Sequence, residues 1–128
     1  MPHLAIDYSA NMEARVDMAA LCDCIRLAAL ETGVFPKAGI RVRAFKADHV
    51  SIADGDGEHG YIDISVRLRE GRDLDTRKQA TARIFEAAEA FLKPVLDEYP
   101  VALSLEMRNI DAGLSPKLNT IRKFMKEE

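Results

Sequence analysis

The chain lacks any apolar run that approaches the ~20 residues a helix needs to span a membrane. The segment PHLAIDYSA, which follows Met1, also lacks the basic stretch and the long apolar core of a signal peptide. From these two absences we expect a cytoplasmic protein that has no membrane partner.

Cysteine, histidine and excess positive charge are also scarce. The two cysteines, Cys22 and Cys24, lie too close together in a helical pattern to favour a disulfide, and a lone C-x-C is a poor zinc signal. The three histidines, His3, His49 and His59, are too scattered to form a ligand set. A net charge of -3 argues against general nucleic-acid binding. We therefore expect a reduced protein with no metal, no organic cofactor and no nucleic-acid partner.

The composition is sufficient for one folded domain. Hydrophobic residues make up 48% of the 128 positions, enough for the chain to bury a core of its own. We interpret residues 1–128 as a single domain with two similar halves, about residues 2–53 and 60–110, followed by a C-terminal tail. A segment rich in Asp and Gly, residues 54–60, separates the halves.

The first half has the pattern strand, helix, strand. Alternating apolar residues predict a strand over residues 3–8. A helical period follows over about residues 17–32, and Gly33 is a plausible helix stop. Residues 39 to about 52 then read as a long strand.

The second half repeats that order. Residues 61–68 alternate as a strand, and Asp73 is a candidate N-cap for a long helix that Pro94 should bend or end. Residues 101–107 alternate as a fourth strand. The expected apolar stripe of the helix consists of Thr81, Ile84, Phe85, Ala88, Phe91, Leu92 and Val95.

Two β-α-β units side by side predict an α+β fold of two layers. With right-handed crossovers, a four-stranded mixed sheet would carry both helices on one face. The opposite face would present small, polar and charged side chains, among them Ala5, Ser65 and Ser104. Such a face suits a subunit interface or a water-filled channel better than a second dry core. We therefore expect several copies of the chain to assemble.

Pro2 is the most informative single residue. Methionine before a small second residue is normally removed, and removal would leave a free prolyl amine at the N-terminus. An α-amino group titrates near neutrality, with a reference pKa of about 7.7–8.0, so it can serve as a general base. A prolyl amine is more basic and would need burial and nearby positive charge to lower its pKa. By position alone, a proline at residue 2 is more often incidental.

Three longer sequence motifs accompany Pro2. TGVFPKAGIRVR covers residues 32–43, GRDLDTR covers residues 71–77, and ALSLEM covers residues 102–107. With these motifs at these separations behind the N-terminal PH, the chain resembles the tautomerase superfamily over nearly its whole length. Within that superfamily it is most similar to the 5-carboxymethyl-2-hydroxymuconate isomerases, which implies a fold like that of macrophage migration inhibitory factor.

The resemblance implies a cofactor-independent isomerase of homoprotocatechuate (4-hydroxyphenylacetate) degradation. In that family a 1,3-proton transfer shifts a double bond in a substrate with two or three carboxylates. Pro2 matches the catalytic base, and Arg41 and Arg72 match the arginines that bind substrate carboxylate and carbonyl oxygens. Guanidinium suits this role because it pairs bidentately with carboxylates and stays charged. The resemblance also implies a homotrimer.

The residues themselves leave simpler interpretations open. Arg41 could be a solvated strand residue, and Arg72 could be a surface partner of the nearby acidic residues; we interpret Arg43, Arg67 and Arg69 as surface residues. Two other functions also remain open. One is another activity of the same superfamily on a different keto-enol acid, and the other is a non-catalytic trimeric binding module.

Overall fold

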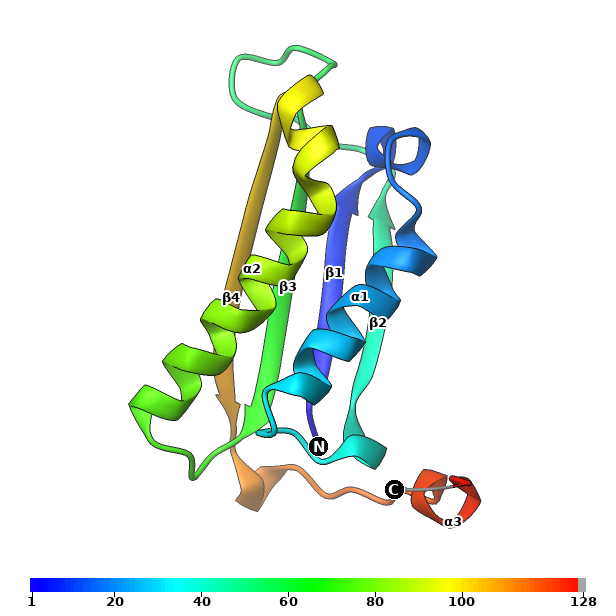
Figure 1. Cartoon of the computed structure of the whole chain (residues 1–128). Coiled ribbons are helices and arrows are strands. Elements are labelled where there is room, and N and C mark those ends of the chain that lie inside the picture. Colours follow the sequence, from blue (N-terminus) through cyan, green and yellow to red (C-terminus); the bar gives the residue numbers. More distant parts are fainter. Residues whose placement is uncertain (127–128) are drawn as a thin grey trace.

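A computed structural model describes residues 1–126 and contains one mixed sheet with two long helices (Figure 1). The strands are β1 (His3–Ser9), β2 (Arg41–Ala47), β3 (Gly60–Arg69) and β4 (Val101–Ile110), and the long helices are α1 (Met18–Glu31) and α2 (Leu74–Glu98). Short helical turns complete the chain: η1 (Ala10–Ala14), η2 (Lys37–Gly39), η3 (Ala112–Leu114) and α3 (Ile121–Phe124).

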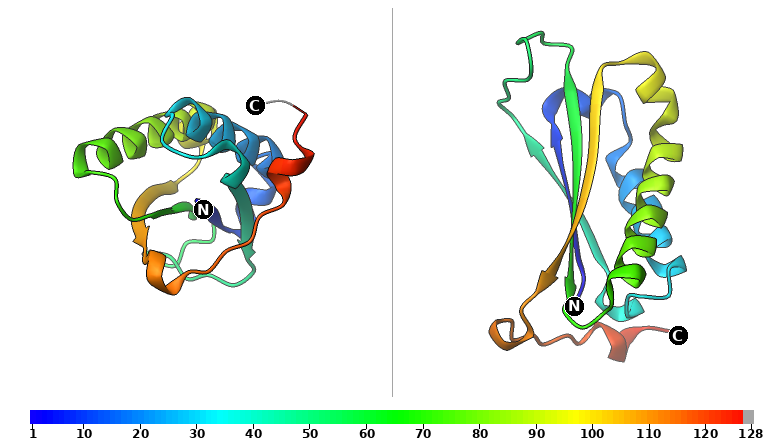
Figure 2. Two further views of the ribbon diagram at one scale, coloured as in Figure 1. Left: turned by 90° about the horizontal axis from the view of Figure 1, so that it is seen from below. Right: turned by 90° about the vertical axis from the view of Figure 1, so that its left-hand side faces the viewer.

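The four strands have the spatial order β2-β1-β3-β4. β1 pairs parallel with β2 and antiparallel with β3, and β3 pairs parallel with β4. Both long helices lie against one face of the sheet, as the edge-on view in Figure 2 shows. The predicted α+β fold, with two β-α-β units that share one mixed sheet, is confirmed.

An aspartate side chain caps the N-terminus of each long helix. Asp17 Oδ1 accepts a hydrogen bond from the Ala20 amide at 3.1 Å, and Asp73 Oδ1 accepts one from the Thr76 amide at 2.8 Å. Each bond satisfies an amide that has no partner within its helix. Gly33 follows α1 with φ +71°, a conformation that glycine adopts without strain. The predicted cap at Asp73 and the predicted helix stop at Gly33 are thus confirmed.

The core lies between the sheet and the helices. Even-numbered residues of β1 and β3 point into it, so their alternation with polar residues follows the two-residue period of a strand. In α2 the fully buried positions repeat every four residues, a narrower stripe than we predicted, because Phe91 is 37% exposed. The α2 residues in the core are Ala80, Ile84, Ala88 and Leu92.

The predicted bounds of β2 are wrong. β2 spans Arg41–Ala47 rather than residues 39 to about 52, because Gly39 belongs to the turn η2 and residues 48–51 carry exposed side chains outside the ladder. Of the two effects expected of Pro94, a bend or an end, the helix end does not fall at Pro94 itself, because α2 continues to Glu98. Val95 and Leu96 pack against the core beyond Pro94, and this packing stabilises the last turn despite the missing amide.

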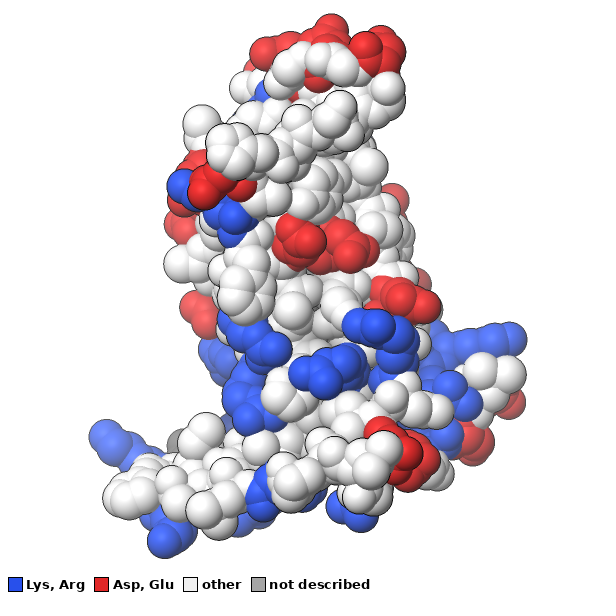
Figure 3. Space-filling view, turned by 180° about the vertical axis from the view of Figure 1, so that it is seen from behind, with Lys and Arg blue, Asp and Glu red and all other residues white. Residues whose placement is uncertain are grey.

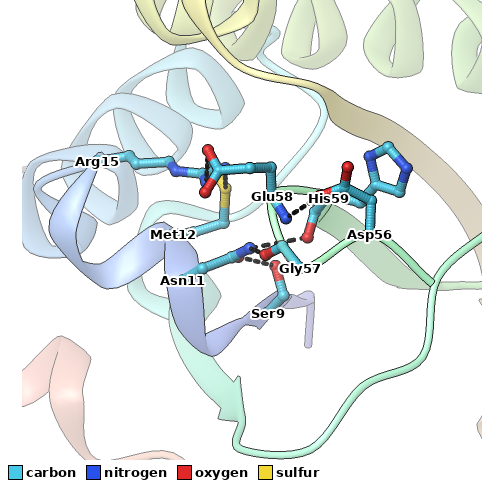
Figure 4. Close-up of polar contacts among 8 residues, drawn as sticks. All are labelled: Ser9, Asn11, Met12, Arg15, Asp56, Gly57, Glu58 and His59. Carbon is cyan, nitrogen blue, oxygen red and sulfur yellow. Dashed lines mark hydrogen bonds and ion pairs between the residues drawn. The ribbon is translucent and has the colours of Figure 1, made fainter.

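The chain segment between β2 and β3 is tied to the end of β1 (Figure 4). Asn11 Nδ2 donates to the backbone carbonyl of His59 at 2.7 Å and to that of Gly57 at 3.3 Å. Asn11 Oδ1 accepts from the buried Ser9 hydroxyl at 2.7 Å, and Ser9 Oγ accepts from the Tyr61 amide at 3.0 Å. These bonds hold the two halves in register at the end of the sheet away from the N-terminus.

Close packing at this junction requires glycine at position 60. A Cβ there would lie 2.8 Å from Met12 Sδ and 3.0 Å from Asn11 Oδ1, closer than such atoms approach.

Among residues 1–126, no helix is both long and apolar enough to cross a membrane.

Replacing Asn11 tests the junction. In Asn11→Ala the Ser9 hydroxyl and two backbone carbonyls lose a partner, so we expect a loss of about 1–3 kcal/mol in the free energy of unfolding, measured by urea denaturation. Asn109→Ala is the matched control, because Asn109 is exposed on β4. Equal denaturation midpoints for both variants would show that the Asn11 bonds contribute nothing.

Candidate functional site

Pro2 is fully buried at the beginning of β1. It packs so closely on Gly39 that a Cβ at position 39 would lie 3.1 Å from Pro2 Cδ. Gly39 belongs to η2, the turn that leads into β2, and β2 pairs with β1. The AGIR part of the sequence motif therefore forms the backbone surface on which Pro2 rests.

Two adjoining clefts open beside the N-terminus. One has a volume of about 400 Å³ and is bounded by η2 and by the C-terminal segment, which we define as Ser115–Leu118. The other has a volume of about 260 Å³ and is bounded by β1, β2 and the same segment. Met1, Lys117 and Leu118 line both clefts, and His3 and Arg41 line the second. The N-terminus thus lies where the two clefts meet.

Arg41 is half-buried at the first position of β2, directly opposite His3 in the ladder. Its Nη2 lies 2.9 Å from His3 Nε2, and its Nε is buried without a hydrogen-bond partner. A buried donor without an acceptor is unfavourable by roughly 1–3 kcal/mol. The structure therefore brings Pro2 and Arg41 together and leaves part of the Arg41 guanidinium unsatisfied.

His3 lies between two arginines. Arg43 Nη1 is 3.3 Å from His3 Nδ1, on the other side of the ring from Arg41. Both guanidinium groups can only donate, and a neutral imidazole offers one acceptor nitrogen, so only one of the two contacts can be a hydrogen bond. Burial and, after it, the positive charges of Arg41, Arg67 and Arg43 together lower the pKa of His3 to about 4. His3 is therefore neutral at pH 7.

The same end of the sheet carries a basic row. Arg41, His3, Arg67 and Arg108 are successive partners across the four strands, on the face that the helices leave open. Figure 3 shows this face, with lysine and arginine gathered near the C-terminal segment and acidic residues further along the sheet. Among residues 1–126, Arg41, Arg43 and Arg67 form no ion pair. This end of the molecule therefore has positive charge available for an anion.

The N-terminal amine lies in this positive environment. Burial lowers the pKa of the Met1 amine, and the charges of Lys117, Arg41 and Arg69 lower it further, in that order. After removal of Met1, the amine would belong to Pro2, which is the more deeply buried residue. The two causes that depress the pKa of a prolyl amine, desolvation and nearby positive charge, are therefore both present.

Arg72 lies in the loop between β3 and α2, apart from these clefts. Its Nη2 donates to the Val34 carbonyl at 3.0 Å and its Nη1 donates to the Arg69 carbonyl at 3.3 Å. Within residues 1–126 it is absent from the lining of both clefts beside Met1. Arg72 thus connects two loops of its own chain, and the structure does not bring it together with Pro2 and Arg41.

Lys117 is the site residue that sequence reasoning missed. It lies in the irregular segment after η3, where no periodic pattern places a side chain, and only the path of the folded chain brings it to the N-terminus. Arg69, interpreted as a surface residue, is also close enough to act on the amine. Among the residues described, no three His, Cys, Asp or Glu side chains are grouped so that they could hold a metal ion.

The low pKa of His3 predicts a pH dependence of stability. Between about pH 4 and the unfolded pKa of about 6.5, the unfolded chain binds a proton that the folded chain does not. The contribution of His3 to stability therefore rises with pH across this window and is constant above it. We expect the loss of stability between pH 7 and pH 4.5 to be smaller in His3→Gln than in the parent, measured by urea denaturation. An imidazole titration by NMR with a midpoint near 6.5 would contradict this.

Comparison with known proteins identifies the family of the chain. The sequence profile of the 5-carboxymethyl-2-hydroxymuconate isomerases matches residues 2–125. The 5-carboxymethyl-2-hydroxymuconate Delta-isomerase of Escherichia coli is 29% identical over 98% of this chain and 100% of its own length.

Solved structures extend the comparison. A crystal structure of a 5-carboxymethyl-2-hydroxymuconate delta-isomerase is 32% identical with a TM-score of 0.91 and covers 100% of this chain and 95% of that chain. A symmetric trimer of fused 4-OT shares only the fold, at 15% identity and a TM-score of 0.67, over 91% of this chain and 93% of that chain. From the matched profile and the similar enzymes together, we conclude that this chain belongs to the 5-carboxymethyl-2-hydroxymuconate isomerase family and is an isomerase.

Proposed function

We propose that this isomerase acts on 5-carboxymethyl-2-hydroxymuconate in homoprotocatechuate degradation and uses the amine of Pro2, freed by removal of Met1, as its general base. The main observation in support is the position of Pro2. It is buried against Gly39, next to a cleft that Arg41 and Lys117 line, where positive charge lowers the pKa of an amine.

The reaction needs one group that removes a proton and returns it. The neutral amine of Pro2 takes a proton from one position of the substrate, and the remaining electron pair spreads over the conjugated system as a dienolate. The resulting ammonium then delivers the proton two atoms away, so the double bond moves and no atom is gained or lost. An amine that is neutral near pH 7 suits both steps, because it takes up and releases the proton at similar cost.

Arg41 supplies charge where the dienolate forms. Its unsatisfied Nε and its place in the cleft fit a group that binds a substrate oxygen or carboxylate. We assign Arg72 to a second carboxylate or carbonyl oxygen. Because Arg72 does not line the clefts of its own chain, we assign its contact to a substrate bound across a subunit boundary.

Such a boundary exists in the homotrimer that we propose. The sheet has one face without helices, and the fused 4-OT protein with this fold is a symmetric trimer. Several large apolar side chains are also exposed in the single chain and would gain by burial against other copies. They are Phe45 (56% exposed), Leu114 (81%), Leu118 (90%) and Phe124 (79%).

The form of the N-terminus should decide activity. A preparation with Met1 removed should isomerise the substrate in an ultraviolet assay, whereas a form that retains Met1 should lose at least 100-fold in kcat, because general base catalysis contributes about 10²–10⁴. Pro2→Ala, once processed, should keep partial activity through its primary amine. Intact mass spectrometry establishes which form is present. A Met1-retaining form with the full rate would rule out the proline amine as the base.

Removing either arginine should lower kcat/KM and leave the assembly intact. Arg41→Ala and Arg72→Ala should each cost about 2–4 kcal/mol of transition-state stabilisation. Arg26→Ala, on the exposed side of α1, is the control and should match the parent. Light scattering should give the mass of three chains for every form. Activity within twofold of the parent for both site variants would contradict their assignment, and a monomeric parent would contradict the trimer.

A further inference from the structure

The C-terminal segment from Ser115 to Leu118 forms a wall of the site. It passes beneath the end of the sheet that carries the N-terminus (Figures 1 and 2). Asn119 fixes the segment, since its Nδ2 donates to the Ala38 carbonyl at 2.9 Å and its Oδ1 accepts from the Ile121 amide at 2.8 Å. Ala38 belongs to η2, the same turn that contacts Pro2 through Gly39. The segment is therefore anchored to the backbone that positions Pro2.

The anchor places Lys117 at the N-terminus. Lys117 lines both clefts, and its side chain is within hydrogen-bonding reach of the N-terminal amine. Arg41 lines the second cleft, so the two cations face one space from different parts of the fold. Among residues 1–126, no carboxylate forms an ion pair with Lys117 or with Arg41. Two cations and an amine with no acidic partner favour the binding of an anion with more than one charge.

We propose that Lys117 is a substrate-binding residue, whose ammonium group pairs with one carboxylate of the substrate while Arg41 binds another. This role rests on the proposed function. A muconate carries two carboxylates and a carboxymethyl group adds a third, so the substrate has one carboxylate more than the two that Arg41 and Arg72 are assigned to bind. Lys117 selects for acids with several carboxylates over acids with one.

The same lysine favours the neutral form of the base. After burial, its positive charge is the largest cause of the lowered pKa of the Met1 amine, and we extend this effect to the Pro2 amine that removal of Met1 would free. A substrate carboxylate bound at Lys117 would neutralise part of the lysine's charge, so Lys117 would lower the pKa of the amine less while substrate is bound. The rate at saturation therefore reports on the pKa of the amine, whereas the affinity reports on the pairing of Lys117 with the carboxylate.

The test compares two acids and three variants in the processed protein. The acids are 5-carboxymethyl-2-hydroxymuconate and phenylenolpyruvate, which has a single carboxylate. Lys117→Met should raise KM for the muconate about tenfold, the effect of losing one charge-assisted contact of about 1.4 kcal/mol, and change KM for phenylenolpyruvate less than twofold. Lys117→Arg should restore most of the affinity. Lys123→Met removes an exposed charge from the same tail and should match the parent.

Each outcome decides the proposal. If Lys117→Met changes KM for both acids equally, or for neither, or if Lys123→Met reproduces its effect, the role of Lys117 is overturned while the isomerase activity stands. If the processed parent isomerises neither acid, the proposed function is overturned and the role of Lys117 with it. A selective rise in KM for the muconate, reversed by arginine, supports the direct pairing.

Discussion

The central position of β1 in the sheet is the constraint on which the site depends. β1 pairs on one side with β2 and on the other with β3, and its even-numbered side chains are buried in the core between sheet and helices. A strand held in this way cannot shift by one residue without exchanging its buried and open faces. The register therefore fixes Pro2 against η2 and sets His3 opposite Arg41. Burial of the N-terminus is a direct consequence of the core.

Electrostatics and packing act together at this end of the molecule. The open face collects arginines from three strands, of which Arg41, Arg43 and Arg67 form no ion pair among residues 1–126, and the C-terminal segment adds Lys117. In isolation such a concentration of positive charge is unfavourable, and after burial it is the second cause of the low pKa of His3. An anionic substrate would relieve it. The same residues that oppose protonation of the amine would thus attract the acid on which it acts, a combination often found where enzymes adjust pKa values.

Residue patterns predicted the fold well where they are periodic. The alternation in β1, β3 and β4 and the caps at Asp73 and Gly33 were sufficient to place the layers. The end of β2 was not predictable. The strand ends before Asp48, where the chain becomes an exposed loop, and no glycine or proline marks this change in the sequence. For the site, motif resemblance predicted Pro2, Arg41 and Arg72, and the folded chain brings the first two together. Lys117 carries no local signal, since the tertiary path of an irregular tail brings it to the amine.

The most direct test of the account is the pKa of the Pro2 amine itself. It can be measured by a ¹⁵N NMR titration of processed protein labelled at proline. The account predicts a midpoint lowered from that of a free prolyl amine, because the amine is buried beside Arg41 and Lys117, and a return toward higher pH in Lys117→Met. A midpoint at the ordinary value of a free prolyl amine would contradict the account, because the amine would then be protonated at neutral pH and could not act as the base.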